Sequence, residues 1–76
     1  MELTNHIEVN PKVMMGKPVV KGTRITVEII LETLSHGMTF SDILNAYPTL
    51  TEQKIKDALA YAAEALKGDA IYPVPV

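Results

Sequence analysis

The side chains that usually carry catalysis or hold a metal ion are few in this chain, and their spacing supports neither role. The sequence has no cysteine and two isolated histidines, His6 and His36, which excludes cysteine-based zinc sites and leaves too few ligands for another metal centre. Glu28 and Glu32 are four residues apart and could share a cation, but a solvated helix face is the commoner reason for such a pair. We therefore expect no catalytic residue, no metal and no cofactor, and a protein that is not an enzyme.

The basic side chains are the stronger candidates for function, because they are distributed unevenly along the chain. Residues 1–24 contain four basic and two acidic residues, whereas residues 25–76 contain three basic and seven acidic ones, within a formal net charge of -2. A basic segment on an acidic body is suited to phosphates or to an acidic partner. Lys17, Lys21 and Arg24 are accordingly predicted to contact nucleic acid. The alternative is a solvated ribbon whose lysines protect an edge strand from aggregation.

A second group of candidate nucleic-acid contacts follows the predicted turn at residues 47–50. Gln53, Lys54 and Lys56 lie in the first turns of the longest predicted helix, where the recognition helix of a helix-turn-helix unit meets a DNA groove. Glutamine can pair with adenine, and lysines can pair with phosphates. Nearby acidic residues oppose phosphate binding, and the sequence pI of about 5.5 is low for a DNA-binding domain. DNA binding is therefore favoured only in a dimer that supplies two basic segments.

Three capped helices are predicted to position these side chains. The expected ranges are residues 27–36, 40–46 and 52–67. Each helix is preceded by a threonine that can cap its first turn, with the apolar spacing of a hydrophobic staple around it. These threonines are Thr26, Thr39 and Thr51. The apolar periodicity of the helices predicts a core that includes Leu31, Leu34, Ile43, Leu44, Ile55, Leu59 and Leu66.

The N-terminal third is predicted to form a short β-hairpin or two-stranded ribbon. Residues 6–9 alternate polar and apolar side chains, and Val19-Val20 is β-branched, as is typical of strands. Turns are expected at Asn10-Pro11 and at Gly16-Lys17-Pro18, because Asn, Gly and Pro favour turn geometry. A ribbon this short is marginal by itself and must pack on the helices or on another copy of the chain.

Length and composition indicate one small domain. The chain has 76 residues, so residues 1–76 are predicted to form a single domain with a ribbon arm (1–24), a three-helix unit (25–68) and an extended tail (69–76). The fold class is mainly α, a three-helix helix-turn-helix unit with a short N-terminal β-hairpin or ribbon. No apolar run approaches the ~18 residues of a membrane span, and nothing signals export. We expect a cytoplasmic protein with no membrane contact, which forms a homodimer.

The predicted tail carries apolar side chains on a proline-rich segment. Pro73 and Pro75 favour an extended chain, which loses little entropy on binding. Ile71, Tyr72 and Val74 are predicted to bind a partner, because an extended apolar strip can lie in a groove. The alternative is that the tail folds back over the chain's own helices and covers part of the small core.

Several short motifs resemble those of one prokaryotic family. They are Asn10-Pro11, the segment from Gly16 to Ile25 with its Gly-Lys-Pro-x-x-x-Gly-Thr-Arg pattern, Gly37-Met38-Thr39, Tyr47-Pro48-Thr49-Leu50-Thr51 and Ala58-Leu59-Ala60-Tyr61-Ala62. Over roughly residues 5 to 66, nearly the whole chain, the pattern is similar to the domain-of-unknown-function family 433. The resemblance implies a homeodomain-like helical fold behind a short N-terminal β segment, and it brings no catalytic residues.

The resemblance also implies a function. Members of the family often appear beside genes for small PIN-like nucleases, which suggests an antitoxin that sequesters a PIN-like nuclease toxin and can also bind operator DNA. The alternative is a stand-alone helix-turn-helix DNA-binding protein or protein-interaction adaptor with no toxin partner. Within the shared segment, Gly22 is expected to supply a tight turn. Arg24 is expected to anchor that turn by bonding carbonyls or a carboxylate, in preference to contacting a ligand.

Overall fold

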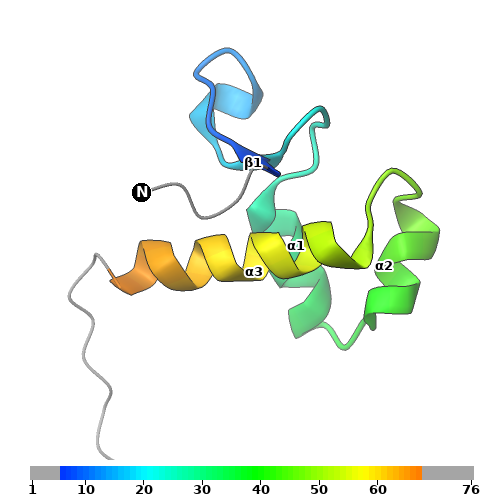
Figure 1. Ribbon diagram of the computed structural model, residues 1–76. Helices are drawn as coiled ribbons and strands as arrows, with labels where there is room; N and C mark the ends of the chain where they lie inside the picture. Colours follow the sequence, from blue (N-terminus) through cyan, green and yellow to red (C-terminus); the bar gives the residue numbers. More distant parts are fainter. Residues whose placement is uncertain (1–5, 68–76) are drawn as a thin grey trace, which may run out of the picture.

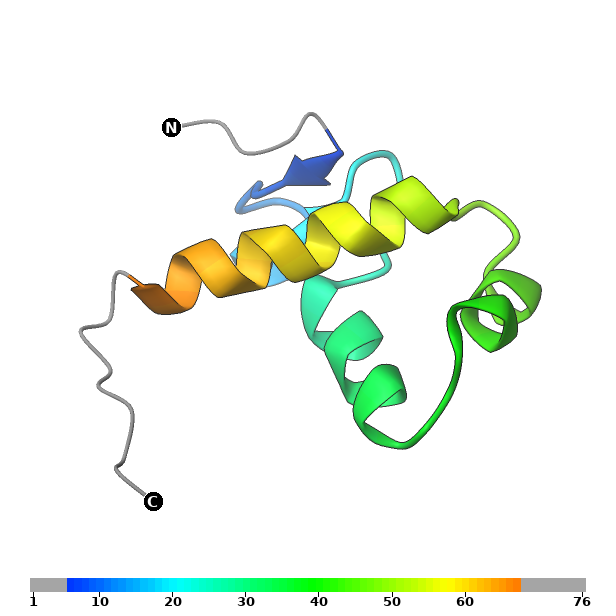
Figure 2. The same ribbon diagram turned by 60° about the horizontal axis from the view of Figure 1, so that its bottom comes forward.

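A computed structural model describes residues 6–67 of the chain, and within this range the fold is mainly helical (Figure 1). The elements, in order, are β1 (Ile7–Glu8), a single turn of 3-10 type η1 (Met14–Gly16), β2 (Val19–Val20), α1 (Val27–Ser35), α2 (Phe40–Ala46) and α3 (Glu52–Lys67). The longest helix, α3, crosses α1, while α2 lies near the N-terminal end of α3 and the β-ribbon lies on the other side of α3 (Figure 2). The mainly α fold class with an N-terminal hairpin, predicted from the sequence, is confirmed. Among residues 6–67, no helix combines the length and the apolar character that a membrane span needs.

The helices begin where the threonines predicted that they would. The hydroxyl of Thr26 accepts a hydrogen bond from the amide of Ile29 at 3.0 Å, and that of Thr51 accepts one from the amide of Lys54 at 3.2 Å. Thr39 and Asp42 form a capping box in which each side chain accepts from the other residue's amide, at 3.1 and 3.0 Å. Each cap satisfies an amide that the helix itself leaves unpaired and contributes about 1 kcal/mol. The predicted bounds of α2 and α3 are confirmed, and α1 ends one residue earlier than predicted.

The core lies where the three helices meet the second strand. Both residues of β2, Val19 and Val20, are completely buried. The buried side chains that cluster together are Val20, Val27, Ile30, Ile43, Leu50, Ile55 and Ala58. A fully buried aliphatic side chain of this size contributes about 1.5–3 kcal/mol relative to an exposed one. The ribbon and the three-helix unit therefore share one core.

The predicted core is correct for some positions and wrong for others. Ile43 and Ile55 are buried, whereas Leu34 and Leu44 are partly buried and pack against the core. Leu59 is partly buried and lies outside the central cluster.

Leu31 and Leu66 were wrongly placed in the core, since they are 37% and 55% exposed. Leu31 lies about 100° around α1 from Ile30, and it is Ile30 that is buried. Leu66 lies in the last turn of α3, which extends beyond the elements packed on the rest of that helix.

The second strand is paired on both sides. β1 and β2 are antiparallel, with Ile7 opposite Val20 and Glu8 opposite Val19. On its other side, Val20 donates its amide to the carbonyl of Ile25 at 2.9 Å, and Val27 donates to the carbonyl of Pro18 at 2.9 Å. The backbone groups of β2 are thus satisfied while its side chains are buried, which is how so short a ribbon becomes stable.

Candidate functional site: the ribbon end and the start of α3

The turn that leads from β2 into α1 is held by a threonine. Gly22 has a φ of +80°, which a glycine adopts without steric cost, so its predicted role in a tight turn is confirmed. The hydroxyl of Thr23 donates to the carbonyl of Val20 at 2.7 Å and accepts from the amide of Ile25 at 3.0 Å. These two bonds close the turn.

The prediction that Arg24 anchors this turn is wrong. Within residues 6–67 its guanidinium makes no hydrogen bond or ion pair, and the residue is exposed. The hydroxyl of Thr23 already occupies the carbonyl of Val20 that a turn anchor would use. Arg24 is therefore available to contact another molecule.

A left-handed turn precedes β2. Met14, Met15 and Gly16 have φ angles of 49°, 58° and 84°, and the turn is closed by bonds from Gly16 to Val13 and from Lys17 to Met14, both 3.1 Å. A residue other than glycine in this region costs on the order of 1 kcal/mol or more. The turn leaves Met15 94% exposed and Met14 39% exposed. Nothing in the residue types predicted this conformation for two methionines.

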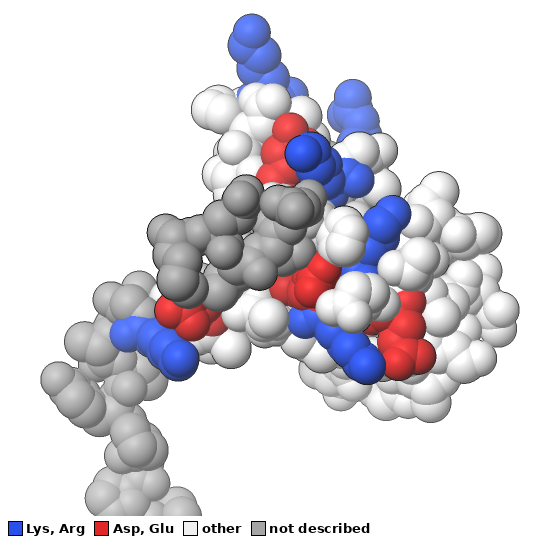
Figure 3. Space-filling view, viewed as in Figure 1, with Lys and Arg blue, Asp and Glu red and all other residues white. Residues whose placement is uncertain are grey.

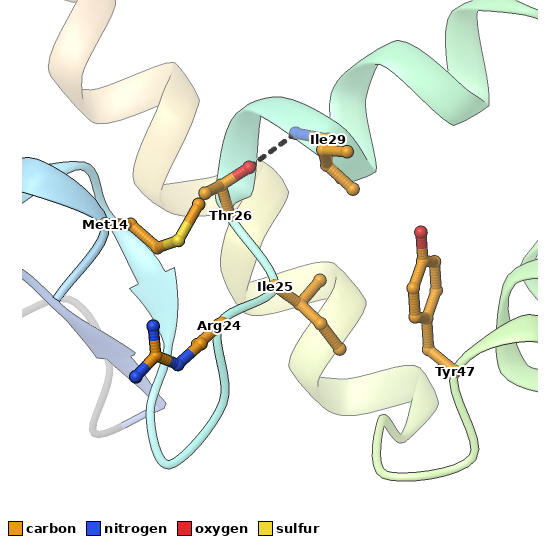
Figure 4. Close-up of a pocket in the computed structure, with 6 residues that line it drawn as sticks. All are labelled: Met14, Arg24, Ile25, Thr26, Ile29 and Tyr47. Carbon is orange, nitrogen blue, oxygen red and sulfur yellow. Dashed lines mark hydrogen bonds between the residues drawn. The ribbon is translucent and has the colours of Figure 1, made fainter.

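An apolar hollow lies between this turn, the start of α1 and the end of α2 (Figure 4). Its volume is about 130 Å³ and its lining residues are Met14, Arg24, Ile25, Thr26, Ile29 and Tyr47. Tyr47 follows the last residue of α2, where Pro48 disfavours a further helical residue. Its side chain points toward the part of α1 that carries Ile29. No pattern in the sequence reveals this hollow, because its walls come from three segments that are far apart in the chain.

The basic side chains of residues 12–24, the segment called the ribbon end here, are mostly unpaired. The Nζ atom of Lys17 lies 3.1 Å from Oε1 of Glu28, but both side chains are well exposed, so the pair contributes little to stability. Within residues 6–67, Lys12, Lys21 and Arg24 form no ion pair. Basic side chains project from this end of the molecule in the space-filling view (Figure 3). The ribbon end therefore presents uncompensated positive charge beside apolar surface.

The basic residues at the start of α3 are, in contrast, all engaged. Lys54 donates from Nζ to the carbonyl of Thr49 at 3.3 Å, and Lys56 lies 3.1 Å from the carboxylate of Glu52. Gln53, the candidate base-reading residue, donates from Nε2 to Oδ1 of Asp57 at 3.0 Å. The structure thus brings the three predicted contacts onto one stretch of α3 but surrounds them with internal partners.

A polar contact that the sequence did not predict ties the ribbon to α3. Nδ1 of His6 contacts Oδ2 of Asp57, and their side chains are 41% and 16% exposed. The same carboxylate accepts from Gln53 through its other oxygen. The two partners are 51 residues apart, so no local pattern could reveal the contact.

Two further predictions concern groups of residues. In the part of the chain that the structure describes, no group of three or more His, Asp or Glu could hold a metal ion. The predicted partner-binding residues of the tail, Ile71, Tyr72 and Val74, lie outside the described residues.

The capped helices α1–α3, with α2 and α3 joined by a tight turn and a paired ribbon at the N-terminus, define a small, mainly helical domain of the helix-turn-helix type. The model of the family described as protein of unknown function (DUF433) matches residues 7–62. The chain belongs to this family, as its motifs predicted.

Two relatives show how far the similarity extends. Over 60 residues the chain is 37% identical to uncharacterized protein y4eO of Sinorhizobium fredii (strain NBRC 101917 / NGR234), a match that covers 78% of this chain and 27% of that protein. The crystal structure of a DUF433 member protein from Anabaena variabilis ATCC 29413 is similar with a TM-score of 0.79 and 27% sequence identity, covering 87% of this chain and 65% of that one. The chain thus spans about a quarter of the first relative's length and somewhat less than two thirds of the second.

Proposed function

We propose that this chain is a non-catalytic, antitoxin-like binding protein of the cytoplasm, and that it sequesters a PIN-like nuclease. The observation that carries the proposal is the ribbon end, where Lys12, Lys21 and Arg24 are unpaired within the described residues and lie on the segments that also expose Met15. Interfaces of this kind combine charge complementarity, which speeds and orients association, with an apolar contact that supplies affinity.

A nuclease is a partner of suitable chemistry. Metal-dependent nucleases hold their divalent ions with carboxylates, which leaves the active-site mouth acidic. A cationic surface can cover such a mouth and exclude the nucleic-acid substrate. The choice of a PIN-like nuclease rests on the gene neighbourhoods of the family to which this chain belongs. The proposal includes a homodimer, because large apolar side chains such as Leu31 and Leu66 are exposed on the single chain.

Operator DNA is the second candidate ligand. The observation that favours DNA is the tight turn between α2 and α3, because two helices joined in this way form a helix-turn-helix unit. On this surface Lys21 and Arg24 would contact phosphates directly, whereas Lys17 would first have to leave Glu28. Gln53, Lys54 and Lys56 would have to exchange their present partners before they could contact DNA. A stand-alone adaptor without a toxin would use the same ribbon end for another acidic protein.

The test is co-purification from the native cell, identification of the bound protein by mass, and an assay of its nuclease activity with and without this chain. We expect a stoichiometric complex in which nuclease activity is lost. A double variant, Lys21→Glu with Arg24→Glu, should weaken the complex by at least about tenfold, or 1.4 kcal/mol.

Lys67→Glu is the control for charge reversal elsewhere on the surface, because Lys67 lies at the far end of α3 beside Glu64, and it should leave the complex within about twofold. Equal losses in both variants, or a captured nuclease that stays fully active, would contradict the proposal. Lys56→Glu separates the second candidate, since it should affect binding to operator DNA and not to the nuclease.

A further inference from the structure

The hollow at the ribbon end has mostly apolar walls, and the polar side-chain groups on its lining that have no partner within the described residues are the hydroxyl of Tyr47 and the guanidinium of Arg24. Met14, Ile25, Ile29 and Tyr47 supply most of its surface. Thr26 is 5% exposed, and its hydroxyl already accepts from the amide of Ile29 (Figure 4). Ile29 and Met14 are each 39% exposed, so two large apolar side chains meet water at one place. Such a surface gains free energy when an apolar group covers it.

The size of the hollow limits what can enter it. Its volume is about 130 Å³, and an apolar protein cavity of roughly 150 Å³ holds one benzene molecule. One branched aliphatic or aromatic side chain is therefore the natural occupant, and a longer apolar segment would not fit.

The charge of Arg24, at the edge of the hollow, indicates which chemical group should adjoin the inserted apolar side chain. In Figure 4 the guanidinium of Arg24 lies on the same side of the hollow as Met14 and points away from Tyr47, so it borders the hollow without filling it. It has no ion pair within the described residues. A guanidinium presents a planar fork of donors that matches a carboxylate in a bidentate arrangement. The nearest acid along α1, Glu28, lies 3.1 Å from Nζ of Lys17, which partly offsets its charge toward an incoming carboxylate.

The left-handed turn supports a binding role for this wall. Met14 has a φ of 49°, a conformation that persists in non-glycine residues only where the surroundings hold it, and such residues cluster at binding sites. Met14 is one of the residues that line the hollow.

We propose that this hollow is an anchor site for a partner segment in which a bulky apolar side chain adjoins a carboxylate. The apolar side chain enters the hollow and the carboxylate pairs with Arg24. The inference rests on the proposed function in one respect, because the segment belongs to the protein partner. Within the ribbon end, the hollow and Arg24 are then the site that recognises the partner, and they select an apolar side chain beside a carboxylate.

The first test uses small probes and the full 76-residue chain. We would titrate N-acetyl-leucine, its neutral analogue N-acetyl-leucinamide, and acetate, and follow backbone amide shifts by NMR. N-acetyl-leucine should bind in the millimolar range, as expected of a fragment with about a dozen heavy atoms, with shifts confined to residues around Ile25, Ile29 and Tyr47. It should bind about two- to fivefold more tightly than the neutral analogue, the range of an exposed ion pair, and acetate should produce no such shifts.

Two variants assign the effect to the hollow. Arg24→Gln should remove the difference between acid and amide while leaving amide binding intact, and Lys67→Gln, at the far end of α3, should preserve it. Ile29→Asp should abolish binding of both probes; because Ile29 is partly exposed, the dispersion of the amide spectrum will show that this variant still folds. Shifts scattered over the surface, or equal binding of acid and amide by the unchanged chain, would overturn the proposal.

Capture of the nuclease then separates the two proposals. If the nuclease binds the unchanged chain and Ile29→Asp equally well, the anchor site is refuted and the proposed function stands. If the probes bind at the hollow and no nuclease is captured, the chemistry of the hollow stands and the proposed function fails. If Ile29→Asp loses both the probes and the nuclease, both are supported.

Discussion

The ribbon end and the start of α3 both carry the basic side chains that the sequence offers as contacts, and they differ in what those side chains already do. At the ribbon end, Lys12, Lys21 and Arg24 have no ion-pair partner among residues 6–67. On α3, Lys54 bonds a carbonyl and Lys56 pairs with an acid one turn earlier. The residue types alone make both regions candidate contacts. Of the two regions, only the ribbon end has basic side chains that can meet a partner without breaking an internal contact, although its Lys17 is paired with Glu28.

The largest effect should come from the core that the two regions share. Ile55 is fully buried in the cluster that joins α3 to β2 and α1, so Ile55→Ala should lower the free energy of unfolding by about 2–5 kcal/mol. Urea denaturation followed by circular dichroism measures the change. Leu66→Ala is the control, because Leu66 is 55% exposed, and it should cost less than about 0.5 kcal/mol. A comparable loss in both variants would mean that the last turn of α3 is covered by another molecule, as a dimer interface at this turn would do.

A smaller effect is expected from the contact between the two regions. His6→Ala removes one of the polar contacts of Asp57 and should lower the free energy of unfolding by about 1 kcal/mol, the usual net value of a partly exposed polar contact. Hydrogen exchange should show faster exchange at the amide of Lys21, which bonds the carbonyl of His6, with α2 unchanged. His36→Ala, at the exposed end of α1, should change neither quantity. Unchanged protection at Lys21 would show that the backbone pairing alone holds the ribbon.

The smallest effect should come from the left-handed turn before β2, where a substitution should raise the free energy of unfolding. Met15 has a left-handed backbone, which glycine adopts freely, so Met15→Gly should raise the free energy of unfolding by about 0.5 kcal/mol after glycine's entropic cost. Ala60→Gly, at an exposed position within α3, should instead lower it by about 1 kcal/mol. Thermal denaturation of the two variants side by side measures the contrast. Destabilisation by Met15→Gly would show that the methionine side chain itself contributes to the fold.

Local signals carried the prediction of the helices. Thr26, Thr39 and Thr51 mark helix starts because a hydroxyl satisfies amides within its own turn, and Gly37 and Pro48 mark ends for equally local reasons. The periodicity of apolar residues could say which side of a helix is apolar. It could not say which neighbour covers each position.

The candidate site depended on contacts that local patterns do not encode. His6 meets Asp57 across 51 residues, and the hollow takes its walls from η1, α1 and the residue after α2. The turn is anchored by Thr23, whereas the sequence predicted Arg24, because the short side chain of Thr23 reaches the carbonyl of Val20 within the turn. The sequence therefore identified the basic residues, and the structure separated those that are free to bind from those that are occupied.

Because β2 is at once the inner strand of the ribbon and part of the buried core, binding at the ribbon end is linked to the lifetime of the whole domain. A partner that binds only the folded chain, and whose free concentration is about 100 times the dissociation constant of the complex, adds about 2.7 kcal/mol to the free energy of unfolding. The unfolded fraction, which is the form that proteases cut, then falls about a hundredfold. A free chain would thus be degraded much faster than a bound one, so the abundance of this protein in the cell would follow the abundance of its partner.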